Sequence, residues 1–592
     1  MIDRTAESPR AARRVAKGKA AGEADKLTPR HAPVSPTPLA RAALMRGLAA
    51  HRTGDLPGAE AAYREAAAAA PGWADPLVNL GAALRSQGRK PEGLDVLQRA
   101  VDLAPDNADA LNNYGNALRD AGRLDEAIEA YRRGLVGKPR APDLHENLAT
   151  ALLEKKELTQ AIELLSKAVK LAPDRASAWH FLAAALFSAE KWEAAIVAYG
   201  RAVALKRENA EAWFGLGVAL ETTNRFEEAI RALGRTLVLN PNHGKALRHY
   251  SQVLVSLGDL AGGLSLIDEA VAKGGSGNDA ELVRARASLL LGDFTIGWPA
   301  YEARWSRVTD QKPPEFPFPR WQGEDVNGKT IVVWAEQGVG DVINFSRVLP
   351  RLAARGARVA FVCAPEIAPV IDAGMRGVAK VMAAPAKIGR ADFHVPLLSV
   401  PGPLGPPWEP GPHEVPYLKV PAGRKVPVAL AQAPAGIKIG FAWAGNPKHG
   451  NDKRRSVRLE RFLPLMDIPG IQWFSLQVGD APRAQIAELG AEPLFTDLAP
   501  DLTDFGDTAA ALAALDLLVS VDTATVHLAG ALARQVWALM PFAPDWRWRL
   551  HRADTPWYPT MRLVRQPKVG DWDSVFETVR IDLLALAGKK KR

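Results

Sequence analysis

The sequence predicts a stack of helical hairpins followed by an α/β region with two Rossmann-like lobes. Two observations support this fold class. Pro71, Pro105, Pro139, Pro173 and Pro241 are separated by 34 residues or by twice 34, which is typical of a helical repeat. Short β-rich runs alternate with helical stretches in the second half. At roughly 150 residues per domain, the 592 residues are too many for one compact domain.

Composition and charge exclude several classes of protein. With 47% hydrophobic and 24% charged residues, the chain has the composition of a globular protein rather than a disordered or fibrous one. A net charge of +9 over 592 residues is too dilute to indicate nucleic-acid binding. The single cysteine, Cys363, excludes an intramolecular disulfide framework. Because no apolar run suits a signal peptide or a membrane span, we expect a cytoplasmic protein that does not bind membranes.

Seven repeats, beginning at residues 40, 74, 108, 142, 176, 210 and 244, account for the first half. Small residues at the eighth position, such as Gly47 and Gly115, would let two helices approach closely. Large residues at the twenty-fourth position, such as Tyr63 and Tyr131, would fill the neighbouring space. This pattern resembles the tetratricopeptide repeat. We expect a basic, disordered arm over 1–39 and a superhelix over 40–305, with residues 278–305 as a degenerate cap.

Asparagine recurs at the sixth position of three successive repeats, as Asn79, Asn113 and Asn147. The apolar positions face the hairpin partner, so the sixth position points elsewhere. An asparagine side chain donates and accepts hydrogen bonds at once, which suits it to hold the backbone of an extended peptide. The arrangement is similar to the asparagine ladder of the eukaryotic O-GlcNAc transferase superhelix. The alternative is that all three are solvated residues on an exposed helix face.

The second half begins after a proline-rich segment, 306–329, which we interpret as a linker. A Pro/Gly-rich segment at 401–436 then divides the β-rich runs into two groups. We expect a first lobe at 330–420, a second lobe at 436–580, and a helix end with a basic tail at 581–592. The expected strands are 330–335, 358–363, 391–395, 437–444, 471–476, 516–521 and 535–540.

The first expected strand leads directly into a glycine-containing loop and a helix. Ligands of parallel sheets bind beyond the carboxyl ends of the strands, so this loop is a candidate site. It is neither a dinucleotide-binding motif nor a phosphate-binding P-loop. A carboxylate at a helix start is either a helix cap or a catalytic group. The loop consists of Glu336, Gln337, Gly338, Val339 and Gly340, followed by Asp341.

The strand expected at 516–521 ends in a second polar segment, with Asp522, Thr523, Thr525 and His527. Free amides at a helix start favour phosphate, and the threonines and the histidine add donors that would reach it. Asp522 would instead hold a sugar hydroxyl. The alternative is an ordinary helix cap with a core-facing histidine.

The segments GVGDVINFSRVLP and SVDTATVHLAGAL, one in each lobe, resemble the heptosyltransferase-type glycosyltransferases, which have the GT-B fold. Residues 40–580 are more similar still to a bacterial family that joins tetratricopeptide repeats to such a domain. Some members of that family glycosylate flagellin, often with nonulosonic acids. Its other hallmarks stand here as Trp443–Pro447, Asn451–Ser456, Ser475–Gln477, Asp507–Ala510 and Pro544–Trp548.

The resemblance implies a role for each motif. Asp341 would be the catalytic base that accepts the acceptor's proton. Cations and the helix start at 522–528 would stabilise the departing phosphate without a bound metal. The donor would be a CMP- or UDP-linked sugar, with no further cofactor. The donor-binding residues would be Asn446, Lys453, Arg454, Arg455, Ser456, Gln477, Asp522, Thr523, Thr525 and His527, although Lys453–Arg455 is also compatible with a solvated loop.

These expectations lead to a cytoplasmic protein O-glycosyltransferase. The repeats would capture a protein acceptor, flagellin being the family's example, and the lobes would transfer a sugar to its Ser or Thr. One alternative is a non-catalytic adaptor or export chaperone that keeps the transferase fold. Another is a transferase that acts on a polysaccharide or a lipid.

Overall fold

The computed structural model describes residues 36–273, 277–306, 314–385, 388–409, 411, 414–447 and 452–590. The arm expected at 1–39 therefore lies almost entirely outside the described residues, as do Asn451 and the last two residues of the basic tail. The chain forms two compact units, one ending at Gly215 and the other beginning at Leu216.

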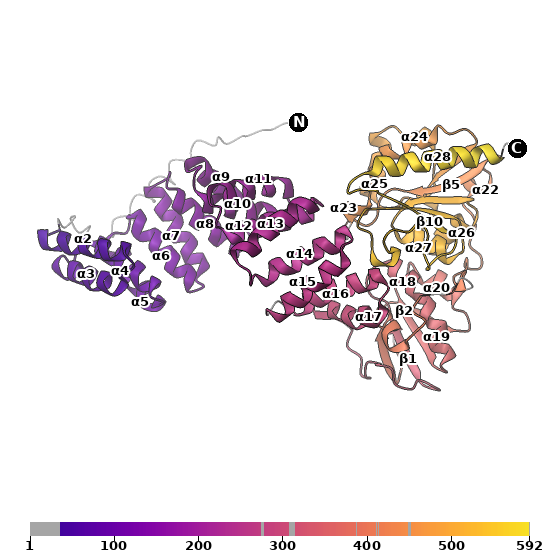
Figure 1. The fold of residues 1–592 in the computed structure, drawn as a ribbon, viewed down its shortest axis with the longest axis horizontal. Coiled ribbons are helices and arrows are strands. Elements are labelled where there is room, and N and C mark those ends of the chain that lie inside the picture. Colours follow the sequence, from indigo (N-terminus) through magenta and orange to yellow (C-terminus); the bar gives the residue numbers. More distant parts are fainter. Residues whose placement is uncertain are drawn as a thin grey trace, which may run out of the picture. The chain divides into compact units, whose positions relative to one another are not determined.

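The first unit is a stack of helical hairpins, drawn in indigo to purple in Figure 1. Successive hairpins pair two helices and then pack against the next pair. The helices are α2 (Pro38–Arg52), α3 (Leu56–Ala69), α4 (Ala74–Ser86), α5 (Lys90–Leu103), α6 (Ala108–Asp120), α7 (Leu124–Gly137), α8 (Pro142–Glu154), α9 (Leu158–Leu171), α10 (Ala176–Ser188) and α11 (Trp192–Leu205).

Small and large residues meet inside each hairpin, as the repeat pattern predicts. A Cβ atom added to Gly47 would lie 2.5 Å from the ring of Tyr63, and one added to Gly115 would lie 2.5 Å from Tyr131. Both tyrosines are fully buried. The glycine is required because the aromatic ring occupies the volume that a side chain would need.

The second unit begins with the remaining repeats and continues into the α/β region. Its helices are α12 (Ala210–Thr222, which spans the division between the units), α13 (Phe226–Leu239), α14 (Gly244–Leu257), α15 (Leu260–Ala272), α16 (Gly277–Leu291) and α17 (Phe294–Tyr301), followed by the 3₁₀ turn η1 (Glu302–Ser306). Phe294 and Trp298 are buried in the same apolar cluster as the strands that follow. The last repeats therefore share a hydrophobic core with the α/β region and belong to the same compact unit.

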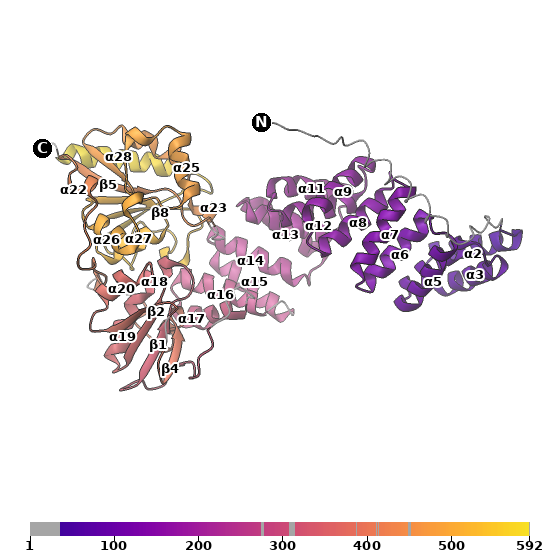
Figure 2. The same ribbon diagram turned by 180° about the vertical axis from the view of Figure 1, so that it is seen from behind.

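The first lobe is a parallel sheet with the order β3-β2-β1-β4. Figure 2 shows it below the second lobe, with α19 and α20 beside the strands. Its elements are β1 (Thr330–Trp334), α18 (Val339–Phe345), η2 (Ser346–Val348), α19 (Leu349–Ala354), β2 (Arg358–Cys363), α20 (Ala368–Gly374), β3 (Ala379–Ala383), β4 (Phe393–Pro396), η3 (Leu397–Ser399) and α21 (Pro401–Leu404).

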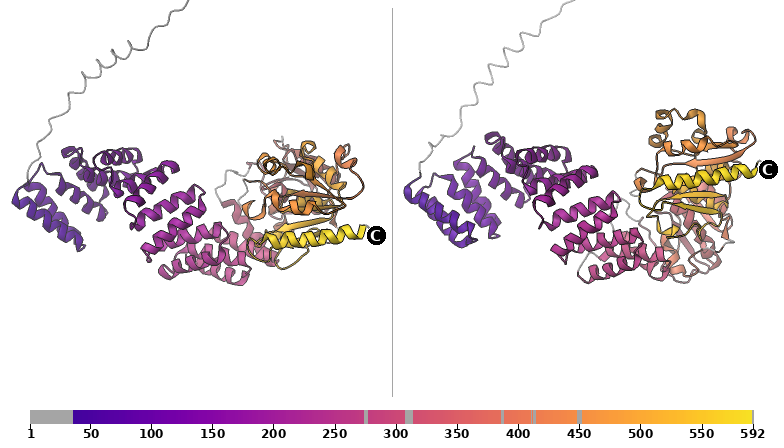
Figure 3. Two further views of the ribbon diagram at one scale, coloured as in Figure 1. Left: turned by 90° about the horizontal axis from the view of Figure 1, so that it is seen from above. Right: turned by 45° about the horizontal axis from the view of Figure 1, so that its top comes forward.

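The second lobe is a parallel sheet with the order β10-β9-β8-β5-β6-β7. The lobe contains α22 (Val428–Ala431), β5 (Ile437–Ala442), α23 (Asp452–Arg455), η5 (Leu459–Arg461), α24 (Leu463–Met466), β6 (Ile471–Ser475), α25 (Asp480–Glu488), η6 (Glu492–Leu494), β7 (Thr496–Asp497), η7 (Ala499–Asp501), α26 (Phe505–Ala513), β8 (Leu517–Val521), α27 (Ala524–Ala531), β9 (Val536–Met540), η8 (Trp546–Trp548), β10 (Met561–Arg565) and α28 (Trp572–Lys590). Side chains of α28 pack with alternate residues of β5 and β8, while α26 and α27 share the other apolar cluster. Figure 3 shows α28 lying along this lobe.

Three strands are absent from the sequence-based expectation. β3, β7 and β10 each lie at an edge of a sheet, and β3 and β10 carry the charged residues Lys380 and Arg562 within short apolar runs. Edge strands expose one side, so their apolar pattern is weaker than that of a central strand. The seven expected strands match β1, β2, β4, β5, β6, β8 and β9.

The segment 306–329 differs from the linker that we expect. Trp321 is 1% exposed and belongs to the apolar cluster of the first lobe. Its backbone N–H donates to the carbonyl of His394 in β4 at 2.8 Å, and Arg320 bridges the same residue. Over its described part, this segment therefore packs on the first sheet.

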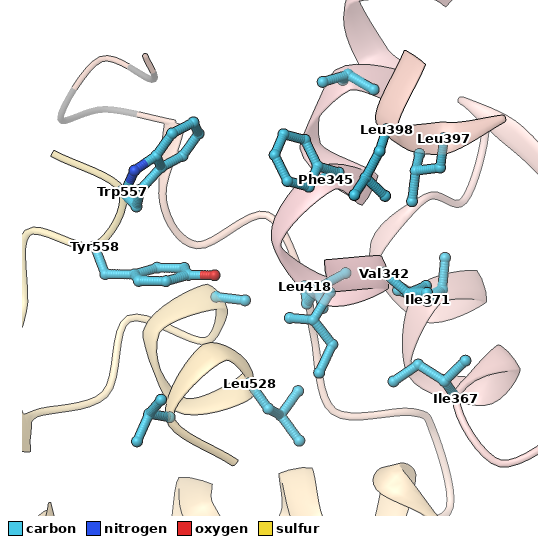
Figure 4. Close-up of a cluster of buried hydrophobic side chains, with 14 of the residues drawn as sticks. Val342, Phe345, Ile367, Ile371, Leu397, Leu398, Leu418, Leu528, Trp557 and Tyr558 are labelled. Carbon is cyan, nitrogen blue, oxygen red and sulfur yellow. The ribbon is translucent and has the colours of Figure 1, made fainter. Parts of the chain in front are cut away.

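The two lobes meet through a buried apolar cluster. Figure 4 shows Val342 and Phe345 of α18 facing Leu528 of α27 and the pair Trp557 and Tyr558. The Asn344 amide adds a polar contact and donates to the Tyr558 hydroxyl at 2.9 Å. None of the helices in the described ranges combines the length and the apolar composition that a membrane crossing requires.

Candidate functional site

A cavity of about 400 Å³ lies between the two lobes, at the carboxyl ends of β1, β5, β8 and β9. Because parallel strands point their carboxyl ends the same way, loops that are far apart in the sequence converge here. Ten of the predicted site residues line the cavity: Gln337, Gly338, Gly340, Asp341, Asn446, Arg454, Arg455, Asp522, Thr523 and His527.

Asp341 lies at the start of α18 and has two partners. One carboxylate oxygen accepts the Gly338 backbone N–H at 3.1 Å, so the residue does cap its helix. The other oxygen accepts a hydrogen bond from the Arg547 guanidinium, which comes from the second lobe. The carboxylate is therefore both a helix cap and half of an ion pair that spans the cavity.

Arg547 joins three groups at the rim of the cavity. Its side chain is only 6% exposed, and it also donates to Asp545 at 2.7 Å. Burial alone would raise the pKa of Asp545, but the neighbouring Arg547 holds it below its usual value. The guanidinium also lies over the ring of Trp546, 4.6 Å from its centroid. Arg547 is thus held in place by two carboxylates and an aromatic ring.

The starts of α18 and α27 approach each other closely. A Cβ atom on Gly340 would lie 2.9 Å from the His527 ring, which explains the glycine at this position. Thr523 is the N-cap of α27, but its side chain makes no capping bond to the first turn. The first turn of this helix therefore lacks a side-chain cap, and Thr523 and Ala524 line the cavity, so this end of the helix favours an anion.

His527 is a buried, oriented imidazole. The Tyr558 hydroxyl accepts the Asn344 amide and lies 3.0 Å from His527 Nδ1. The other ring nitrogen, Nε2, lies 3.9 Å from an Asp522 carboxylate oxygen. Burial lowers the pKa of His527 to about 3 and raises the pKa of Asp522 to about 6. The histidine is therefore neutral at pH 7 and lies beside the Asp522 carboxylate.

The buried histidine predicts a specific loss of stability in acid. The unfolded chain protonates this group below its ordinary pKa of 6.5, whereas the folded chain does not until the pH approaches about 3. The contribution is therefore present above pH 6.5 and is lost as the pH falls, by about 2 kcal/mol between pH 7 and pH 5. His527→Gln keeps a hydrogen-bonding partner for Tyr558. Between pH 7 and pH 5, its free energy of unfolding should fall by about 2 kcal/mol less than that of the wild type.

Urea unfolding at the two pH values measures this difference in the free energy of unfolding. His551 is exposed, and His551→Gln is the matched control for the same substitution at a surface histidine. An identical pH dependence in the wild type and in His527→Gln would contradict the neutral, buried histidine.

Arg454 and Arg455 supply positive charge on the second-lobe side. Arg455 Nε is buried without a hydrogen-bond partner among the described residues, and the side chain lies 3.6 Å from Asp452. Arg454 donates to the Glu221 carbonyl of α12 at 3.3 Å, and burial lowers its pKa. Two guanidinium groups at one wall favour an anionic ligand such as a phosphate.

Several predicted residues lie outside the cavity wall and support it. Ser456 accepts the Gly445 backbone N–H at 2.9 Å, and Gln477 accepts the backbone N–H groups of Trp443 and Ala444. Lys453 lines a neighbouring cavity of about 440 Å³, and Thr525 is half-buried on α27. Glu336 is buried against Arg304. The sequence places these residues in the right loops but does not reveal which side chains face the cavity.

Other cavity residues were not predicted individually. Asp545, Arg547 and Trp548 come from a hallmark segment to which no role is assigned, and Tyr301 comes from the end of the expected cap. Nothing in the residue spacing distinguishes Arg547 from the other arginines. One sequence signal could have indicated these residues: the loop that carries them follows β9, which belongs to the same sheet as β5 and β8.

The three repeat asparagines are half-buried on their helices. Asn79 and Asn113 donate to the carbonyls of Asp75 and Asp109, one helical turn earlier, and Asn147 donates to the Asn112 side chain. Their peptide-binding role stays a prediction.

Comparison with known proteins identifies the repeats. The tetratricopeptide-repeat family matches residues 18–72, 78–143, 181–244 and 223–279, and a second description of this repeat matches 118–186. Protein FlbA of Caulobacter vibrioides is 29% identical over 363 residues, which are 56% of this chain and 60% of FlbA.

Solved structures with some likeness include MamA, Pseudomonas aeruginosa pilF and Cut9–Hcn1. MamA is 28% identical, with 27% of this chain and 94% of that chain covered and a TM-score of 0.26. pilF is 18% identical, with 33% of this chain and 89% of that chain covered and a TM-score of 0.31. Cut9–Hcn1 is 17% identical, with 41% of this chain and 48% of that chain covered and a TM-score of 0.37. These TM-scores are too low to bear on function. The chain carries tetratricopeptide repeats and is similar to FlbA over 56% of its length, and these repeats give it the capacity to bind a protein partner.

Proposed function

We propose that this protein is a glycosyltransferase of the GT-B type that moves a sugar from a nucleotide donor to Ser or Thr of a protein held by its repeats. One observation carries the proposal. The loop after β1 and the segment after β8, which the sequence singles out independently, line one cavity between two parallel-sheet lobes.

The second-lobe wall suits the donor. Arg454, Arg455 and the uncapped first turn of α27 favour the phosphate of a CMP- or UDP-linked sugar. Asp522 and Nε2 of His527 are adjacent, so the carboxylate would accept from sugar hydroxyls, and the imidazole would form hydrogen bonds with sugar hydroxyls or phosphate oxygens. As the bond to the phosphate breaks, these cations would stabilise the charge that develops on it.

The first-lobe wall suits the acceptor. Asp341 faces the same cavity and would take the proton of the attacking hydroxyl as the new glycosidic bond forms. The ion pair with Arg547 orients the Asp341 carboxylate. One carboxylate oxygen would give up its present hydrogen-bond donor and accept the hydroxyl of the acceptor instead. The repeats would select the acceptor polypeptide, with Asn79, Asn113 and Asn147 holding its backbone. We propose flagellin as this acceptor because of the resemblance described above.

Arg455→Met tests the donor side of the proposal. The variant removes a cation whose Nε has no hydrogen-bond partner in the described part of the chain. A lost charge-assisted hydrogen bond of about 1.5–3 kcal/mol should weaken nucleotide binding about 10- to 100-fold. Calorimetric titration with UDP and with CMP measures the affinity.

Arg483→Met is the matched control. Arg483 also has a buried Nε without a hydrogen-bond partner among the described residues and, like Arg455 with Asp452, pairs with an aspartate, Asp497, but it does not line the cavity. The control should bind the nucleotide like the wild type. Equal nucleotide affinity in Arg455→Met and the wild type would contradict nucleotide binding at this wall of the cavity.

A further inference from the structure

The last repeat element lies against the loop that leads to Asp341. Tyr301, the final residue of α17, lines the cavity and donates its hydroxyl proton to the Gln337 side chain at 3.1 Å. Gln337 has a φ of 61°, a left-handed backbone conformation that is costly for a residue other than glycine. A loop in this conformation needs contacts from outside to hold it.

Arg304 supplies a second and stronger contact. Its guanidinium donates two hydrogen bonds to the Glu336 carboxylate: Nε donates to one oxygen at 3.1 Å, and Nη2 donates to the other at 2.8 Å. The two side chains are only 8% and 5% exposed. Glu336 also accepts the Leu398 backbone N–H at 3.1 Å. The residue that begins the loop is therefore fixed by a buried, forked ion pair from the repeat side.

Trp298 extends the contact across both lobes. Its ring meets Phe345 of α18 edge-on at 5.7 Å and Trp546 of η8 at 5.4 Å between centroids. One helix of the repeat region thus packs against the element that carries Asp341 and the element that carries Arg547. A helix that only capped the repeat stack would not need to contact α18 or η8.

We infer that Tyr301 and Arg304 are positioning residues that fix the loop 336–340 and, through it, Asp341. This inference rests on the proposed function as far as the reaction is concerned. The site is composite: the repeat region supplies contacts that the first lobe does not provide for its own loop. Removing those contacts should release the loop while the sheets stay folded.

Amide hydrogen exchange tests this without a substrate. In Arg304→Met the peptide that contains residues 336–341 should exchange about tenfold faster or more, while peptides from β5 and α28 exchange as in the wild type. Arg320→Met is the matched control, because Arg320 also donates to Ser399, at 2.8 Å, and pairs with Glu302 but does not touch Glu336. Unchanged exchange at 336–341, or faster exchange throughout both lobes, would overturn the inference.

Tyr301→Phe keeps the ring and removes only the hydroxyl, so it guards against a variant that fails to fold. It should lower the kcat for transfer about tenfold and leave the KM for the donor unchanged, because the loop and not the donor wall is released. A raised KM with an unchanged kcat would contradict the positioning role. If the wild type proves inactive, the proposed function fails, but the exchange measurement still decides this inference.

Discussion

Asp341→Asn should abolish sugar transfer while the protein still folds and binds its nucleotide. Asparagine keeps the shape of the side chain and can accept the Gly338 N–H that caps α18. It cannot take a proton from the acceptor hydroxyl, and the loss of a general base costs about 10²- to 10⁴-fold in rate. Because Arg547 retains Asp545, the free energy of unfolding should fall by only about 1–2 kcal/mol.

Asp504→Asn is the control for this variant. Asp504 also caps a helix, α26, and also pairs with an arginine, Arg424, but it does not line the cavity. Transfer is measured as the gain in intact mass of the acceptor protein over time. Wild-type turnover in Asp341→Asn would remove Asp341 from the role of base.

Arg547→Met should destabilise the fold more than any other single change at the cavity. The Arg547 side chain is 6% exposed and bridges Asp341 and Asp545, whose side chains are 22% and 36% exposed, so its loss leaves two partly buried carboxylates without their shared cation. Breaking a buried ion pair in this way costs about 3–5 kcal/mol. Urea unfolding should report this decrease in the free energy of unfolding.

Arg424→Met tests whether burial is the cause. Arg424 also bridges two aspartates, Asp504 and Asp507, but its side chain is 27% exposed. An ion pair that water reaches contributes about 1 kcal/mol or less. Losses of similar size in the two variants would contradict the buried bridge. Combining Asp341→Asn with Arg547→Met should cost less than the sum of the single losses, because Asp341→Asn removes one of the two carboxylates that Arg547→Met leaves without a cation.

Much of the fold could be predicted because its signals are local. Two local patterns indicate the repeat: the 34-residue spacing, and the pairing of small with large residues, such as Gly115 with Tyr131. The central strands are continuous apolar runs. The edge strands β3 and β10 lack that signal, since Lys380 and Arg562 interrupt them. The segment before β1 resembles a linker because of its prolines, and only the burial of Trp321 reveals its packing.

The candidate site could be predicted only in part. The carboxyl-end rule is enough to bring Asp341 and Asp522 to the same cavity, since each follows a strand. The partners of these residues depend on how the lobes and the last repeat meet. Arg547 lies in the 3₁₀ turn η8 after β9, and Arg304 lies in the 3₁₀ turn η1 after α17. No local pattern links either arginine to its carboxylate, so three-dimensional packing was needed to find them.

The most direct test is the intact mass of flagellin, and of the whole proteome if flagellin is unchanged, from cells with and without this gene. The account predicts that the acceptor protein loses the mass of one or more sugars when the gene is removed. The wild-type gene should restore that mass, and the Asp341→Asn gene should not. Identical protein masses with and without the gene would contradict a protein glycosyltransferase and favour a binding protein that keeps the transferase fold.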